Sequence, residues 1–137
     1  MHANAADLGV DPSRVTVAGA SAGGGLAAGT VLLARDLGEV PVYRQMLIFP
    51  MIDDRDANES CHAATYPKVW HRSANQYGWS AYLGDACGGP DVPIYAAPAR
   101  ATVEELRGLP AGYIDLRGID AFRGRDIEQG PQVLPAG

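Results

Sequence analysis

The chain has 137 residues with 11 basic and 16 acidic side chains, which give a formal net charge of −5, and 47% of its residues are hydrophobic. This length suits one domain, and the composition is that of a globular protein rather than a disordered chain. Because the acidic balance includes no cluster of Lys or Arg, it argues against nucleic acid or a membrane surface as a partner.

The cysteine content and the first residues bear on the cellular compartment. The two cysteines, Cys61 and Cys87, form no CxxC motif, which excludes a disulfide scaffold and a cysteine-based zinc site. The opening residues, MHANAADLGV, contain no basic region followed by an apolar run, so they predict no secretory signal. Both observations favour a cytoplasmic location.

The first part of the chain predicts a short helix, a strand and a longer helix. Residues 1–8 are typical of the end of a helix, which Gly9 terminates. The β-branched run at 14–18 predicts a buried strand, and residues 19–23 predict a tight turn. Residues 26–37 predict a helix that ends before the next glycine.

A stretch that overlaps these elements has the length of a membrane span. Residues 15–34 carry no charge, and they contain small-residue GxxxG spacings that begin at Gly19 and Gly25. However, three glycines follow one another at 23–25, and each costs a helix about 1 kcal/mol relative to alanine. We therefore expect no membrane span here.

The middle of the chain predicts a second strand and a second long helix. Residues 43–49 predict a strand, and the continuous apolar run at 46–49 is of the kind found in parallel strands that are covered on both faces. A polar loop is expected at 53–65, a helix at 69–83, and a long irregular connection at 85–110.

A third strand and a damaged helix complete the prediction. The strand is expected at 112–116, and a helix from Arg125 onward is interrupted at Gly130-Pro131. Alternating strands and helices are typical of an α/β fold with a parallel sheet and crossover helices. Since a sheet of three strands would leave both edges unpaired, we expect a fragment of a larger α/β domain.

The residues Gly19–Gly23 match the motif G-x-S-x-G, and their setting gives the match its weight. The motif follows a predicted strand and opens a predicted helix, as in a nucleophile elbow that holds the serine hydroxyl above a sheet. In such a turn the small flanking residues allow strand and helix to approach closely. The N–H of Ala22 would then lie at a helix N-terminus that favours an oxyanion.

The same glycines allow a dinucleotide-binding interpretation. The spacing Gly23-x-Gly25-x-x-Ala28 fits the looser fingerprint, and Asp53 and Asp54 follow the next strand, where an acid could bind a ribose. That fingerprint needs its first glycine at the end of the strand, whereas the predicted strand ends at residues 18–19. A dinucleotide-binding βαβ unit is kept as an alternative.

The run LGVDPSRVTVAGASAGG at residues 8–24 resembles the nucleophile region of the α/β-hydrolase-3 family, the hormone-sensitive-lipase-like carboxylesterases. The likeness continues through residues 45–53, through the residues WSAYLG at 79–84, and from residue 109 to residue 123. The resemblance implies a mostly parallel sheet and the hydrolysis of small-molecule acyl esters, with no cofactor and no metal.

The resemblance also implies roles for individual residues. Ser21 matches the nucleophile, the Ala22 amide matches one oxyanion donor, and Gly19 and Gly23 match the glycines of the elbow. Asp120, within the segment GIDAFR, falls at the position of the triad acid. Such an acid holds the tautomer and the charge of a histidine base.

The base itself is not evident in the chain. In this fold the histidine follows the acid, but His2, His62 and His71 all precede it, and each is most simply a surface or loop residue. The family's HGGG loop, which supplies further oxyanion donors, belongs before residue 1. We therefore expect residues 1–137 to form a partial catalytic domain with little activity alone, the alternative being a catalytically silent remnant or an interaction fragment.

Two further groups of residues have ordinary explanations. Aromatic side chains of the helix predicted at 69–83 are more often core than pocket lining. They are Trp70, Tyr77, Trp79 and Tyr82. The acidic residues Asp53, Asp54 and Asp56 lie beside an arginine and have no nearby histidine, so they predict a solvated loop rather than a metal site.

Overall fold

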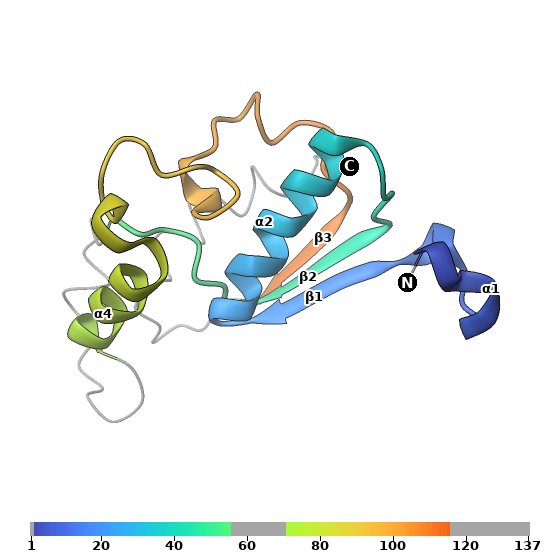
Figure 1. The fold of residues 1–137 in the computed structure, drawn as a ribbon, viewed down its shortest axis with the longest axis horizontal. Coiled ribbons are helices and arrows are strands. Elements are labelled where there is room, and N and C mark those ends of the chain that lie inside the picture. The colour runs from blue at the N-terminus through green and yellow to red at the C-terminus, as the bar shows by residue number, and fades with distance from the viewer. Residues whose placement is uncertain (1, 56–70, 116–137) are drawn as a thin grey trace.

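The computed structural model describes residues 2–55 and 71–115, and Figure 1 shows their arrangement. The α-helices are α1 (Ala5–Leu8), α2 (Ala22–Leu37) and α4 (Arg72–Leu83), and the strands are β1 (Thr16–Ala20), β2 (Arg44–Ile48) and β3 (Gly112–Asp115). Short 3-10 helices lie at His2–Asn4, Pro12–Arg14, Gly84–Ala86 and Pro98–Arg100. The predicted alternation of strands and helices is confirmed as far as β3, and the helix predicted from Arg125 lies outside the described residues.

The strands form a parallel sheet in the order β1-β2-β3. The register pairs Ala18 with Met46 and Met46 with Tyr113, so these three side chains form one row across the sheet. Helix α2 connects β1 to β2, which makes this part of the chain the predicted crossover unit. The fold is therefore a partial α/β fold built on a parallel sheet.

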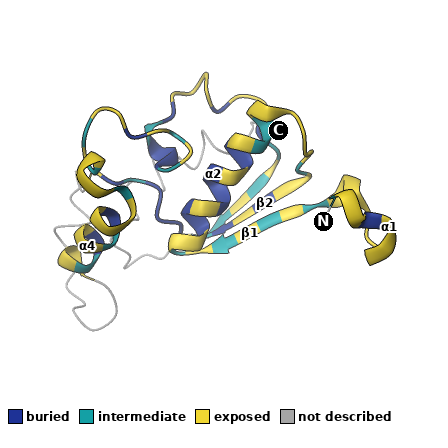
Figure 2. Ribbon diagram, in the orientation of Figure 1, coloured by how far each residue is buried: buried dark blue, intermediate teal, exposed yellow. Residues whose placement is uncertain are grey.

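Helix α2 packs across one face of the sheet, and the main core lies between them (Figure 1). Val31 and Leu32 of α2 and Leu47 of β2 are each only 1% exposed. In Figure 2 the buried side of α2 faces the strands and its exposed side faces solvent. This one-sided burial is what a helix covering a sheet requires.

The opposite face of the sheet is more exposed than the sequence predicted. Residues 46–49 were expected to be covered on both sides, but Met46 is 43% exposed and Tyr113 is 57% exposed. Successive strand residues point to opposite faces, and none of the described helices covers the second face in Figure 1. The prediction of two covered faces is therefore wrong for the part of the chain that the structure describes.

Helix α2 begins at Ala22, four residues earlier than predicted, and therefore includes the three consecutive glycines. These glycines allow close approach to neighbouring backbone. A Cβ on Gly24 would lie 2.9 Å from the Cα of Pro50, and one on Gly25 or Gly29 would overlap the carbonyl oxygen of Met51 or Tyr95. Tertiary packing thus outweighs the poor helix propensity of glycine.

The remaining predictions fit the structure closely. Helix α1 ends at Gly9, which has a left-handed φ of 63°. Helix α4 begins after His71 and lies beside the first turns of α2, away from the strands (Figure 1). Residues 85–110 form the predicted irregular connection, which contains only short 3-10 turns. None of the described helices is long and apolar enough to cross a membrane.

Candidate active site

Ser21 occupies the junction between β1 and α2, where the chain reverses. Its backbone angles are φ 54° and ψ −123°, in the left-handed half of conformational space that a residue with a side chain seldom adopts. Hydrogen bonds hold it there: the Ser21 amide donates to the carbonyl oxygen of Ile48 at 2.9 Å, and the Met51 amide donates to the Ser21 carbonyl oxygen at 2.9 Å. Such a conformation persists only when neighbouring contacts enforce it, and strain of this kind clusters at functional sites.

The two glycines of the motif play different parts. A Cβ on Gly19 would overlap the backbone of Gly23, so the turn requires a glycine at position 19. A Cβ on Gly23 would meet no described atom within 4 Å. On the helix side, close approach is instead needed at Gly24 and Gly25. The sequence predicted that both glycines of the motif must be small so that strand and helix can approach. The structure shows this requirement at Gly19 but not at Gly23.

The Ser21 side chain is half-buried, and its hydroxyl donates to the thioether sulfur of Met51, with Oγ 3.6 Å from Sδ. Sulfur is a weak acceptor, so this contact holds the hydroxyl only loosely. Among the described residues, no histidine or carboxylate hydrogen-bonds to Ser21 Oγ. The described residues therefore provide no base for this hydroxyl.

Ala22 is the first residue of α2, whose length of 16 residues gives a strong helix dipole. Amides in the first turn of a helix have no acceptor within that helix, so they can bind an anion. No acidic side chain lies in this turn to compete for them. The Ala22 amide therefore lies in a suitable electrostatic setting for an oxyanion donor.

The other predicted members of the triad are not brought together by the described residues. Asp120 and His62 lie outside the described residues. His71 caps α4: its Nδ1 accepts a hydrogen bond from the Ala74 amide at 3.2 Å and contacts Ser73 Oγ at 2.9 Å. His2 lies in the first 3-10 helix. His71 is exposed, as predicted for a surface residue, whereas His2 is half-buried within its 3-10 helix.

An apolar cavity of about 240 Å³ opens beside the elbow. It lies next to Ser21 because its walls include Ala22, the following residue, and Met51, the partner of the hydroxyl. The lining residues carry no charge. They are Ala22, Gly25, Leu26, Met51, Gly78, Trp79, Tyr82 and Ala96. The cavity can take an uncharged apolar group close to the serine.

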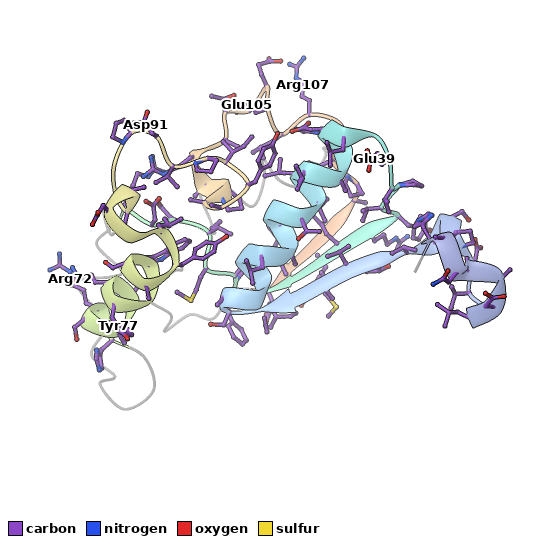
Figure 3. All side chains as sticks on the ribbon, in the orientation of Figure 1. Glu39, Arg72, Tyr77, Asp91, Glu105 and Arg107 are labelled. Carbon is purple, nitrogen blue, oxygen red and sulfur yellow. The ribbon has the colours of Figure 1, made fainter. Side chains whose placement is uncertain are left out.

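The aromatic residues of α4 divide between core, cavity and surface. Trp79 is buried with Met51 as predicted for a core residue, but it also lines the cavity. Tyr82 is half-exposed and lines the cavity, so the prediction that it belongs to the core is wrong. Tyr77 is 77% exposed and points to solvent (Figure 3). Trp70 lies outside the described residues.

The sequence did not identify the part of the cavity contributed by Met51 and Ala96, which lie far from the motif along the chain. Leu26 carried a usable signal, because it stands four residues after Ala22 and so shares its side of α2. Met51 had no comparable signal. It reaches Ser21 because β2 ends next to β1 in the parallel sheet.

Asp54 was predicted to lie in a solvated loop, and this prediction is wrong. Its side chain is fully buried, and it forms an ion pair with Arg100, whose Nε lies 2.7 Å from Oδ1. Burial alone would raise the pKa of Asp54, but hydrogen bonds from Arg100 and the Gly88 amide outweigh burial, so the pKa lies below its usual value. Asp53 pairs with Arg55, and Asp56 lies outside the described residues.

These placements also bear on the dinucleotide and metal hypotheses. Gly23 lies inside α2 rather than in a loop at the end of β1, so the first glycine of the fingerprint is out of register. Asp54 is engaged by Arg100 and cannot serve a ribose. No group of three or more metal-ligating side chains occurs among residues 2–55 and 71–115.

Comparison with known proteins agrees with this geometry. A family model described as "alpha/beta hydrolase fold" matches residues 1–132. The chain is 55% identical over 122 residues to a protein named carboxylesterase NlhH from Mycobacterium tuberculosis, a match that covers 88% of this chain and 37% of that protein. It is 34% identical over 133 residues to the esterase LipI of the same species, covering 95% of this chain and 40% of LipI.

Solved structures give the same picture. A structure titled "Bacterial Heroin Esterase" superposes with a TM-score of 0.89 at 48% identity, covering 96% of this chain and 42% of that one. The esterase LipW from Mycobacterium marinum superposes with a TM-score of 0.84 at 33% identity, covering 96% of this chain and 40% of that one. The chain thus spans about two fifths of the length of these relatives.

Proposed function

The chain belongs to the α/β-hydrolase-3 family, and from that membership we propose that it forms the nucleophile-bearing part of a carboxylic-ester hydrolase in which Ser21 attacks the ester. The observation that supports this proposal most directly is the backbone of Ser21, whose positive φ at the junction of β1 and α2 is the geometry of a nucleophile elbow.

In the proposed reaction, Ser21 Oγ attacks the carbonyl carbon of a small-molecule ester. The hydroxyl proton passes to a histidine, and the carbonyl oxygen becomes an oxyanion. The Ala22 amide, at the positive end of the α2 dipole, donates a hydrogen bond to that oxygen. Collapse of the intermediate breaks the bond to the alcohol, which leaves with the proton from the histidine, and the acyl group stays on Oγ until water displaces it.

Asp120 is proposed to orient the histidine and to stabilise its positive charge. We place the histidine, together with the further oxyanion donors, in parts of the protein beyond these 137 residues, since the chain spans about two fifths of its relatives. Loss of the base costs about 10⁶ in rate and loss of an oxyanion donor about 10²–10³. The chain alone is therefore expected to turn over esters close to the background rate.

The cavity beside Ser21 is proposed to receive one apolar arm of the ester. Its walls offer no charged partner, so a charged acyl or alcohol group would lose its hydration there without compensation. The proposal includes a cytoplasmic location, which the two cysteines favour.

A serine-reactive fluorophosphonate tests the proposal. The matched segment of carboxylesterase NlhH would be replaced by the corresponding residues of this chain, so that the rest of that enzyme surrounds them. We expect this hybrid to be labelled and to hydrolyse p-nitrophenyl esters, and we expect both activities to vanish with Ser21→Ala. A hybrid that folds but shows neither activity would instead favour the catalytically silent relative.

A further inference from the structure

The segment that follows β2, Phe49–Asp54, forms one side of the elbow and is called the exit segment below. Its residue Met51 donates a backbone hydrogen bond to the Ser21 carbonyl oxygen and receives the Ser21 hydroxyl on its sulfur. The segment begins with Phe49 at φ 36°, a strained conformation for a bulky residue. Because strain of this kind persists only under restraint, the position of Met51 depends on what fixes the other end of the segment.

That other end is fixed by the buried ion pair between Asp54 and Arg100. Arg100 Nε and Nη2 donate to the two carboxylate oxygens at 2.7 and 2.8 Å, and the Gly88 amide donates to Oδ2 at 2.7 Å. The Asp54 side chain is fully buried and the Arg100 side chain is 12% exposed. Two parallel bonds from a planar guanidinium fix orientation as well as distance.

A backbone hydrogen bond carries this restraint toward the serine. The amide of Ala99, next to Arg100, donates to the carbonyl oxygen of Ile52, next to Met51, at 3.0 Å. Three interactions therefore follow one another along the exit segment: the ion pair, this backbone bond, and the bond from Met51 to Ser21. They form a contiguous physical link between a buried charge pair and the nucleophile.

We propose that Asp54 and Arg100 are positioning residues for Ser21. The pair holds the exit segment against the elbow, and the hydrogen bond from the Met51 amide to the Ser21 carbonyl oxygen passes this restraint to the backbone that positions the nucleophile. This role rests on the proposed function, since it concerns the attack by Ser21, although neither side chain touches the reacting atoms. A pair that served folding alone would affect stability and leave the alignment of Ser21 unchanged.

The first experiment follows the exit segment in the full 137-residue chain by NMR, with labelled methionine methyl groups and labelled amides. The chain has three methionines, so the Met51 methyl signal can be assigned by comparison with Met51→Leu. We expect Arg100→Lys to shift the Met51 methyl signal and the Ser21 amide signal. The substitution keeps the charge but loses the bidentate geometry, and so leaves the carboxylate paired while loosening the link.

Arg107→Lys is the matched control. Arg107 pairs with Glu104 at 3.0 Å on the surface, where the two side chains are 72% and 73% exposed, and it points away from the protein in Figure 3. We expect this control to leave both signals in place. A folded Arg100→Lys chain with wild-type Met51 and Ser21 signals would overturn the proposal.

The second experiment measures kinetics in the hybrid esterase described above, with active sites counted by covalent labelling. For Arg100→Lys we expect kcat per labelled site to fall by up to ~10²-fold, because misalignment of a nucleophile by an ångström has an effect of that order. We expect any rise in KM to be smaller than the fall in kcat, because Met51 is only one of the residues that line the cavity. The Arg107→Lys hybrid should keep both constants.

The outcomes separate the two proposals. An active hybrid whose kcat per labelled site is unchanged by Arg100→Lys would overturn the positioning role and leave the proposed function intact. A hybrid without Ser21-dependent hydrolysis would overturn the proposed function, and the positioning role with it. If Arg100→Lys prevents folding of the 137-residue chain, the kinetics of the hybrid decide.

Discussion

Ser21 Oγ lies 3.6 Å from Met51 Sδ, so within residues 2–55 and 71–115 the acceptor for the hydroxyl is a thioether. The contact arises because β1 and β2 are neighbouring parallel strands whose carboxyl ends lie side by side. A thioether is a weak acceptor and releases the hydroxyl readily. Met51 thus shields the hydroxyl with an apolar group without competing strongly against a base.

A pair of glycine substitutions tests the close approach of α2 to the exit segment. Gly25→Ala should lower the free energy of unfolding by at least about 1–3 kcal/mol, because its Cβ would overlap the Met51 carbonyl oxygen. Gly23→Ala should raise it by up to ~1 kcal/mol, since alanine is the better helix former and its Cβ meets no described atom. Urea unfolding followed by circular dichroism measures both, and equal losses would contradict the packing role of Gly25.

The lowered pKa of Asp54 predicts how stability depends on pH. Burial acts to raise this pKa, but bonds from Arg100 and Gly88 lower it below the usual 3.8. A carboxylate with a depressed pKa contributes stability above its unfolded pKa and loses that contribution as the pH falls through its folded pKa. The advantage of the wild type over Asp54→Asn should therefore be constant near neutrality and shrink below about pH 4.

Chemical unfolding at a series of pH values measures this difference. Glu104→Gln is the matched control, because it also converts a carboxylate to an amide but in an exposed ion pair that contributes little. If the free energy of unfolding of the wild type exceeded that of Asp54→Asn by more at low pH than at neutral pH, the native state would not favour the ionised form of Asp54.

His71 is expected to act as a helix cap rather than as a catalytic base. Its Nδ1 accepts from the Ala74 amide, so His71→Ala should destabilise the protein by about 0.5–2 kcal/mol. His71→Asp should keep most of the stability, because aspartate is a preferred N-cap residue. In the hybrid esterase His71→Asp should also keep its hydrolysis rate, and loss of that rate with the fold intact would indicate a catalytic histidine at this position.

Tyr82 is expected to limit the size of the apolar group beside Ser21. Tyr82→Ala removes part of the cavity wall, so the ratio of kcat/KM for octanoyl over butyryl p-nitrophenyl esters should rise by about tenfold in the hybrid. Tyr77→Ala is the control, since Tyr77 lies on the same helix but is 77% exposed and lines no part of the cavity. Equal shifts in both variants would show that the cavity does not select the substrate.

The elbow could be predicted from the sequence because its determinants are local. A β-branched run, five residues of G-x-S-x-G and an apolar helix stand next to one another, and the structure places Ser21 at their junction with a positive φ. The start of α2 could not be predicted in the same way. Glycine propensity argues against a helix at residues 22–25, and only the neighbouring backbone of Pro50 and Met51 explains it.

The buried ion pair is a part of the site that could not be predicted from the sequence. Asp54 and Arg100 are 46 positions apart, and nothing in the local pattern pairs them. A cluster of acidic residues beside Arg55 is most often solvated, so the sequence favoured the wrong environment for Asp54. Asp120 and the histidine base remain predictions from family resemblance, since Asp120 lies outside the described residues.

Phe49 carries a consequence for how this protein could be engineered. Glycine adopts a positive φ without steric cost, so Phe49→Gly would relieve strain of order 1 kcal/mol or more at that position. The same replacement would make the backbone more flexible directly after β2, two residues before Met51, whose position depends on this segment. The replacement also removes a half-buried side chain and increases the freedom of the unfolded chain, so relief of the strain does not by itself make the protein more stable. At position 49 a strained backbone is therefore the condition for a fixed direction of the exit segment.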